Sequence, residues 1–318
     1  MVKETMNILS THKQMNMKIK HFSILAFLLS VSSSTLFGQN LTSHPSNLFA
    51  ADDAKLISSD FSFTEGCSVD KKGNVFFTDQ PNDKIWKYGT DGKLSIFLDK
   101  TGRANGTYFD KKGNLITCAD EKGQLWSVSP SGKIKVLINN FNGKQFNGPN
   151  DIWIHPNGDL YFTDPYYQRD YWQRTAPDLS ENDVYYLPKG SKNIKVAASG
   201  LVKPNGIVGT PDGKYLYVSD INAGKTYKYV IEKNGELTNK QLIINKGSDG
   251  MTLDEKGNIY LTLGQGVFIY NPVGELIAEL KIKEGPSNVC FAGKDRNILF
   301  ITARKTIYTL PMKVKGVE

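Results

Sequence analysis

Histidine and cysteine are scarce in this sequence, with four and three copies among 318 residues. Two of the histidines fall within the first 38 residues, which leaves only His44 and His155 in the rest of the chain. His44 precedes the repeated part of the sequence, and His155 lies beside a predicted hairpin turn. A Ser-His-Asp or Cys-His mechanism therefore lacks its base. The sequence also has no Walker-type phosphate loop.

The N-terminal residues have the pattern of a targeting signal. Met17-Lys18-Ile19-Lys20-His21 is a short basic start, and it is followed by an apolar run from Phe22 to Val31 and a Ser-rich stretch to Gly38. This pattern is typical of a secretory signal peptide and is too short for a spanning helix. The sequence predicts a signal peptide with an upstream extension in residues 1–38. It also predicts a single domain in residues 39–318, a periplasmic or secreted location, and no membrane partner once the signal is removed.

Positive charge is spread along the chain and forms no cluster. The formal net charge is +7, of which four lysines and one glutamate place +3 within residues 1–38. The dispersed remainder argues against a nucleic-acid partner. Cys67, Cys118 and Cys290 lie in apolar strand patterns, so an exported protein could pair two of them; buried thiols are the favoured alternative.

Six segments of the sequence repeat one pattern of strand, tight turn and second strand. They read VDKKGNVFFTD, FDKKGNLITCAD, IHPNGDLYFTD, GTPDGKYLYVSD, LDEKGNIYLTL and FAGKDRNILFITA. Their turn positions are Gly73, Gly113, Gly158, Gly213, Gly257 and Arg296. Third and fourth strand patterns follow in each unit, except that the sixth unit lacks the fourth.

Four antiparallel strands in each of six repeats predict an all-β fold, a six-bladed β-propeller. Residues near 54–58 are expected to supply the missing strand of the sixth blade. This N-terminal strand would close the ring and remove an open sheet edge.

Eight residues before each turn position stands an oxygen-bearing side chain. The six are Glu65, Asn105, Asn150, Asn205, Asp249 and Asn288. The first strand of a blade lines the central channel, so these six residues, here called the oxygen ring, are expected at one mouth of that channel. Asn-Gly and Asp-Gly are also turn formers, and four of the six precede glycine. That alternative does not account for Glu65, or for Asn150 and Asn288, which precede other residues.

Oxygen donors without histidine or cysteine suit Ca²⁺ first, and then Mg²⁺ or Mn²⁺. Zn²⁺ prefers nitrogen and sulfur and is the least favoured alternative. A divalent cation can polarise a carbonyl, and a carboxylate beside it can act as general base. With Asp249 as that base, hydrolysis of an activated ester such as a lactone is the expected reaction.

The stretches EGCSVDKKGNVFFTD, FNGPNDIWIHPNGDLYFTDP, KPNGIVGTPDGKYLYVSD, SDGMTLDEKGNIYLTL and GPSNVCFAGKDRNILFITA resemble the family of gluconolactonase, regucalcin and luciferin-regenerating enzyme. The resemblance covers about residues 60–312. It implies a six-bladed propeller with one divalent metal at the channel mouth. It also implies the metal ligands Glu65, Asn150, Asn205 and Asp249, with Asp249 as the base. The Asn150-Asp151 pair would lie near the substrate.

The sequence departs from the animal members of this family at Gly148-Pro149, where they carry an arginine; Arg103 could replace it. The residues expected to contact the lactone are Arg103, Asn105, Asp151, Tyr166 and Asn288. An aromatic insertion in the third repeat, residues 165–183, would either overhang the pocket as a lid or pack on the edge of its blade.

The expected activity is metal-dependent hydrolysis of a sugar lactone such as gluconolactone to its aldonic acid. Two alternatives stay open at this stage. One is hydrolysis of another lactone or of a phosphotriester. The other is a non-catalytic binding propeller in which calcium serves as a structural plug.

Overall fold

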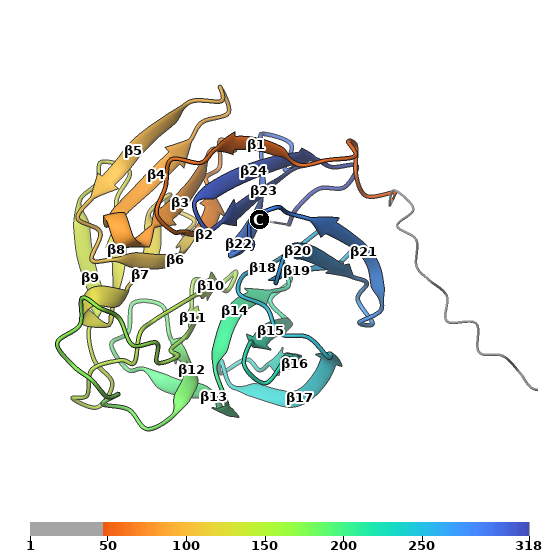
Figure 1. The fold of residues 1–318 in the computed structure, drawn as a ribbon. Coiled ribbons are helices and arrows are strands. Elements are labelled where there is room, and N and C mark those ends of the chain that lie inside the picture. The colour runs from red at the N-terminus through yellow and green to blue at the C-terminus, as the bar shows by residue number, and fades with distance from the viewer. Residues whose placement is uncertain (1–46, 318) are drawn as a thin grey trace, which may run out of the picture. The chain divides into compact units, whose positions relative to one another are not determined.

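The computed structural model describes residues 47–317, and their regular structure is almost entirely β (Figure 1). Six sheets of four antiparallel strands are joined by tight turns and by two short 3-10 helices, η1 (Gln80–Asn82) and η2 (Asp120–Lys122). The predicted signal peptide, residues 1–38, lies outside the described residues. Within residues 47–317 there is no helix with the length and apolar character needed to span a membrane.

The sheets share one strand order, and blades one to six are numbered here by their innermost strands. The innermost strands are β2 (Thr64–Val69), β6 (Ala104–Phe109), β10 (Ile152–Ile154), β14 (Pro204–Gly209), β18 (Met251–Leu253) and β22 (Asn288–Ala292). The second strands are β3 (Val75–Asp79), β7 (Leu115–Ala119), β11 (Leu160–Thr163), β15 (Tyr215–Asp220), β19 (Ile259–Leu263) and β23 (Ile298–Ala303). The third strands are β4 (Lys84–Tyr88), β8 (Gln124–Val128), β12 (Asn182–Leu187), β16 (Lys225–Ile231), β20 (Gly266–Tyr270) and β24 (Thr306–Pro311). The outermost strands are β5 (Leu94–Asp99), β9 (Ile134–Ile138), β13 (Lys195–Leu201), β17 (Leu237–Ile244), β21 (Leu276–Lys281) and β1 (Lys55–Ser58).

The innermost strands form a closed circle. Each contacts the innermost strand of the next blade, and β22 of blade six contacts β2 of blade one (Figure 1). The predicted six-bladed β-propeller is therefore confirmed.

The turn between the first two strands of a blade shows why the sequence repeats. In blade one, the Asp70 carboxylate accepts the backbone N–H groups of Lys72 (2.8 Å) and Asn74 (2.9 Å). Gly73 takes the left-handed backbone that this turn requires, with φ of 89°. Blades two and five repeat the arrangement with Asp110 and Asp254.

Blade six is completed from the other end of the chain. Strand β1 pairs antiparallel with β24, with Lys55 opposite Thr309 and Leu56 opposite Tyr308. The predicted closure by residues near 54–58 is confirmed. It gives the third strand of blade six a partner on both sides.

Removing residues 47–60 should lower the melting temperature and cause association between chains. Without β1, the long strand β24 would expose unpaired backbone N–H and C=O groups along the edge of its sheet. Size-exclusion chromatography and thermal melting would test this against a chain that begins at residue 47. A truncated protein that stays monomeric with an unchanged melting temperature would contradict the role assigned to β1.

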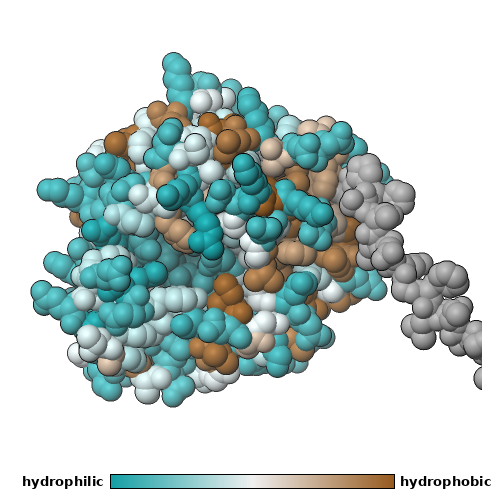
Figure 2. Space-filling view, viewed as in Figure 1, coloured by the Kyte–Doolittle hydropathy of each residue, from teal (hydrophilic) through white to brown (hydrophobic). Residues whose placement is uncertain are grey.

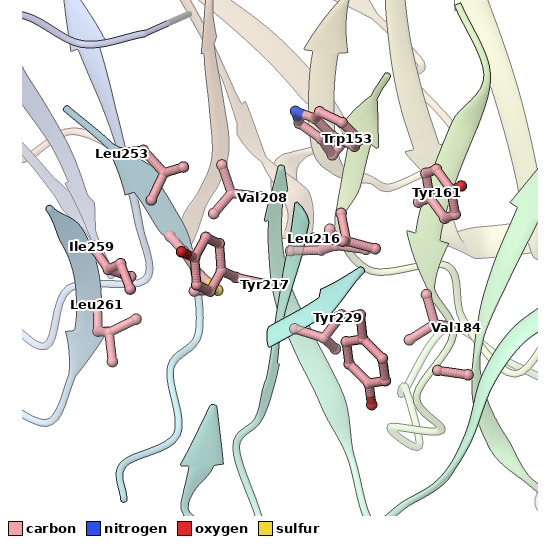
Figure 3. Packing of buried hydrophobic residues seen from close by; sticks show 14 of the residues in the cluster. Trp153, Tyr161, Val184, Val208, Leu216, Tyr217, Tyr229, Leu253, Ile259 and Leu261 are labelled. Carbon is pink, nitrogen blue, oxygen red and sulfur yellow. The ribbon is translucent and has the colours of Figure 1, made fainter. Parts of the chain in front are cut away.

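The hydrophobic core lies between neighbouring blades. Figure 3 shows one part of it, where Trp153 and Tyr161 of blade three face Val208 and Leu216 of blade four, and Leu253 follows from blade five. Large apolar side chains that remain exposed belong mostly to the outermost strands. Hydrophilic residues cover much of the face seen in Figure 2. All three cysteines are buried, in β2, β7 and β22.

Candidate active site

The oxygen ring lies at the start of the six innermost strands, as the sequence predicts. Glu65, Asn105 and Asn205 are the second residues of β2, β6 and β14, and Asn288 is the first residue of β22. Asn150 and Asp249 come two residues before β10 and β18. Five of the six residues are buried, and Asp249 is of intermediate exposure. Asp249 is therefore the less buried of the two acids of the ring.

Glycines let neighbouring members of the ring approach each other closely. A side-chain carbon at Gly66 would lie 2.0 Å from the backbone oxygen of Asn105, and one at Gly106 would lie 2.5 Å from that of Asn150. Gly206 is likewise close to the backbone oxygen of Asp249, and Gly250 is close to the side-chain amide of Asn288. The glycines therefore allow close packing around the channel. This differs from the alternative explanation, in which they would form turns.

Strand irregularities set the direction of the ring side chains. The pairing register shifts directly after Glu65 in β2, and it also shifts across Asn105 in β6 and Asn205 in β14. Such β-bulges are frequent beside active sites, because the extra residue re-aims a side chain. Because of the bulges, side chains at and after these positions do not follow the regular alternation between the two faces of the sheet.

Hydroxyl groups of the second strands fix the backbone of the ring, a feature that the sequence analysis missed. Thr78 donates to the carbonyl oxygen of Asn105 (3.1 Å) and Thr163 to that of Asn205 (2.8 Å), each across a blade boundary. Every one of the six repeats carries a Thr or Ser near the end of its second strand. That recurrence was the available signal.

Three carboxylates repel one another at the ring. Burial raises the pKa of Glu65 well above its usual range, and the negative charges of Asp249 and Asp151 raise it further. Burial also raises the pKa of Asp249 to about 6, against the opposing effects of the Asn205 amide and of Arg169 and Arg304. Acids gathered in this way are an excess of negative charge that a divalent cation would neutralise.

The donor set fits a hard cation. Glu65 and Asp249 supply carboxylate oxygens, and Asn150 and Asn205 supply amide oxygens, which together suit Ca²⁺ or Mg²⁺. No group of three or more His, Cys, Asp or Glu side chains suited to a metal ion occurs within residues 47–317. The ring fits a metal only when its amide oxygens are counted with its two acids. Its role as a metal site stays a prediction.

A cavity of about 150 Å³ opens beside Asp249. Thr262, Ser287 and Arg304 contribute polar groups to its wall, and the residues Phe63, Ile221, Leu263 and Pro286 make part of it apolar. Arg304 lies over Gly285, where a side-chain carbon would come within 3.3 Å of its Nε atom. A small ligand in this cavity would meet the one partly exposed acid of the ring.

The insertion (residues 165–183) contacts the ring through Tyr167. The Asn205 Nδ2 atom donates to the hydroxyl oxygen of Tyr167 at 3.2 Å. Further along, the Arg169 Nε atom and the Tyr171 hydroxyl donate to the carboxylate of Asp120 in blade two, the former at 3.1 Å. The insertion thus leaves blade three and contacts its two neighbours, blades two and four. Its role as a lid stays a prediction.

Of the remaining residues expected to contact substrate, Asp151 lies at the ring, and Arg103 and Tyr166 make contacts elsewhere. The Asp151 carboxylate accepts the N–H groups of Ile152 (2.9 Å) and, in the next blade, Ile207 (3.4 Å). The Arg103 guanidinium lies 4.9 Å from the centre of the Tyr171 ring and donates to the backbone of Pro81.

Tyr166 contacts its own insertion, because its hydroxyl donates to Gln168 and its ring lies 5.7 Å from that of Trp172. It is Tyr167 that reaches the ring, a residue that the sequence does not predict at the site. The two tyrosines are adjacent, and nothing in the sequence separates their directions.

Comparisons with known proteins agree with this architecture. The family model described as "SMP-30/Gluconolactonase/LRE-like region" matches residues 63–305. A gluconolactonase of Zymomonas mobilis subsp. mobilis is 29% identical over 293 residues, which cover 82% of each chain. A solved structure of a protein assigned to the gluconolactonases superposes with a TM-score of 0.79 at 28% identity, covering 86% of this chain and 96% of that one.

A second solved structure, the calcium-binding protein regucalcin of Agrobacterium tumefaciens, superposes with a TM-score of 0.69 and covers 84% of this chain and 95% of that one. At 17% identity it speaks for the fold alone. The chain belongs to the SMP-30/gluconolactonase/LRE-like family, as its sequence predicts, and is by that membership a hydrolase of the lactonase class.

Proposed function

We propose that the protein hydrolyses a sugar lactone, such as gluconolactone, to its aldonic acid. We further propose that it uses one divalent cation, preferably Ca²⁺, bound by Glu65, Asn150, Asn205 and Asp249. The observation that carries this proposal is the position of Asp249. It stands beside a second, buried acid, Glu65, and it lines a cavity of about 150 Å³.

The protein's own groups supply most of the mechanism. Asp249 would accept a proton from the water that attacks the lactone carbonyl carbon. The ring C–O bond then breaks, and the same proton passes to the departing oxygen, which becomes the hydroxyl of the aldonic acid. The Asn205 amide, hydrogen-bonded to Asp249, would hold the carboxylate toward the cavity. The cation, when bound, would polarise the carbonyl as a Lewis acid.

Two observations support the choice of substrate and metal. The Zymomonas gluconolactonase is related along most of its length, which favours a sugar lactone over other esters. The donor set contains only oxygen, which favours Ca²⁺ ahead of Mg²⁺ or Mn²⁺, and places Zn²⁺ last. The partly exposed Asp249 favours catalysis over a purely structural calcium plug, because a plug needs no acid open to a cavity.

We also propose that the protein works outside the cytoplasm. The basic start and apolar run of residues 17–31 support export through a cleaved signal. Its partner is then a small lactone and no nucleic acid or membrane.

A panel of lactones tests the activity directly. We expect gluconolactone hydrolysis that a chelator abolishes and that added Ca²⁺ restores, measured by the release of acid. The panel includes δ-valerolactone, an arylester and a phosphotriester, each with and without chelator. Faster hydrolysis of the phosphotriester than of any lactone, or no metal-dependent hydrolysis at all, would refute the proposal.

A further inference from the structure

Aspartates at the end of the second strand hold the chain that leads into their own blade. In blades one, three and four each carboxylate accepts two successive backbone N–H groups, at 2.7–3.1 Å. The acceptors and their donors are Asp79 with Ser62 and Phe63, Asp164 with Asn147 and Gly148, and Asp220 with Val202 and Lys203. This is a structural task that the fold repeats.

Asp120, the corresponding residue of blade two, does not bind the chain that leads into its blade. The chain leading into blade two is held by Asp83, which accepts the N–H groups of Thr101 (2.9 Å) and Arg103 (2.7 Å). Asp120 is 1% exposed, and its carboxylate binds Arg169 and Tyr171 of the insertion. A buried carboxylate that has exchanged its backbone partners for an arginine and a tyrosine anchors the insertion to the neighbouring blade.

The anchored insertion holds Tyr167 against the oxygen ring. The Tyr167 ring contacts two cations, with the Arg169 guanidinium 5.4 Å and the Lys203 Nζ atom 4.2 Å from its centre. Its hydroxyl oxygen accepts from Asn205, and no acceptor among residues 47–317 takes the hydroxyl's own proton. The hydroxyl hydrogen of this half-buried phenol is therefore available to a ligand, since no acceptor among the described residues binds it.

We propose that Tyr167 is a specificity-determining residue that donates a hydrogen bond to a hydroxyl group of a sugar lactone, and that Asp120 is its positioning residue, acting through Arg169. The proposal deepens the function proposed above and rests on it. The phenol and the two cations beside it form a polar rim on this side of the ring. Such a rim suits a polyhydroxylated lactone, and an unsubstituted or alkyl-substituted lactone has fewer oxygens with which to bind it.

Tyr167→Phe tests the role of the hydroxyl. We expect kcat/KM for gluconolactone to fall about threefold to tenfold, as the loss of one neutral hydrogen bond does. The value for δ-valerolactone, which has no hydroxyl groups, should change by less than about twofold on the same reasoning. Tyr186→Phe is the matched control, because its hydroxyl donates to Asp159 at the turn between β10 and β11 and should leave both values unchanged.

The outcomes separate this inference from the proposed function. An equal loss on both lactones, or no loss on either, overturns the specificity role of Tyr167 while the lactonase activity stands. A parent protein that hydrolyses neither lactone overturns both.

A double-mutant cycle tests Asp120 as the positioning residue. Asp120→Asn should lower the preference for gluconolactone over δ-valerolactone, mainly by raising KM, and should leave the bound metal content unchanged. It should add nothing to that preference in the Tyr167→Phe background. Tyr171→Phe, which removes the hydroxyl that donates to Asp120, should act alike and serves if Asp120→Asn fails to fold. Additive effects of either variant with Tyr167→Phe would overturn the positioning role.

Discussion

Asp249→Asn is expected to lower kcat for lactone hydrolysis by about a hundredfold to ten-thousandfold at saturating metal, the usual contribution of a general base. The replacement keeps an oxygen donor of the same size and removes both a negative charge and the proton acceptor. Affinity for the metal should fall as well. The rate must therefore be measured across a metal titration, so that the loss of the base is separated from the loss of the ion.

Two further variants serve as controls for the decrease in kcat. Asn288→Ala, at a ring position that is not assigned as a metal ligand, should reduce kcat much less. Asp212→Asn removes an exposed acid at the turn leading into β15 and should leave kcat unchanged. If Asp249→Asn with a full metal site hydrolyses lactones at the parental rate, Asp249 is not the base. Asp151, whose charge also acts on Glu65, would then be the next candidate.

The sequence predicts most of this fold because each blade is encoded locally. A turn such as Asp70 to Asn74 closes on itself through side chains only a few residues apart, so its pattern survives in each repeat. The closing strand could be predicted too, because a sixth blade with three strands leaves only one segment to fill it. The ring followed from the same periodicity, since equivalent positions in a propeller meet at its axis.

Periodicity gives no information about the parts that occur once. The insertion has no counterpart in other blades, so its path to the neighbouring blade depends on contacts such as Arg169 with Asp120, 49 residues apart in sequence. Asp120 looks like Asp79 in the repeat pattern, and only the structure shows that Asp83 has taken over the backbone contacts. Tyr167 could not be told from Tyr166 for the same reason. They differ in the contact with Asn205 of another blade, which binds the hydroxyl of Tyr167.

Glu65→Gln is expected to have opposite effects on the protein with and without metal. Glu65 supplies one of two ligand charges, and a pair of unit charges 4 Å apart is worth about 4 kcal/mol at an effective dielectric constant of 20. Metal affinity should therefore fall by about a hundredfold to a thousandfold. The stability that saturating metal confers should fall with it, because a ligand stabilises the folded state in proportion to its binding free energy.

Without metal, the same variant should be more stable than the parent above about pH 6. Buried acids with a raised pKa favour folding while they are protonated, and that stability is lost as pH rises from their unfolded pKa near 4 to the folded value. For Asp249 the folded value is about 6, and for Glu65 burial and its acidic neighbours raise it in the same direction. The metal-free parent should lose stability across this window, and Glu65→Gln, which lacks one of these acids, should lose less.

Melting temperatures measured from pH 4 to pH 8, in chelator and in saturating Ca²⁺, would show whether the order of stability of parent and variant reverses. The order of stability should be variant above parent in chelator at pH 8, and parent above variant in Ca²⁺. Glu121→Gln, which removes an exposed acid in η2, should follow the parent in both series. Elemental analysis supplies an independent measure of bound metal. A Glu65→Gln protein with full metal content and no reversal of order would mean that Glu65 neither binds the cation nor repels Asp249, and the oxygen ring would lose its assignment as the metal site.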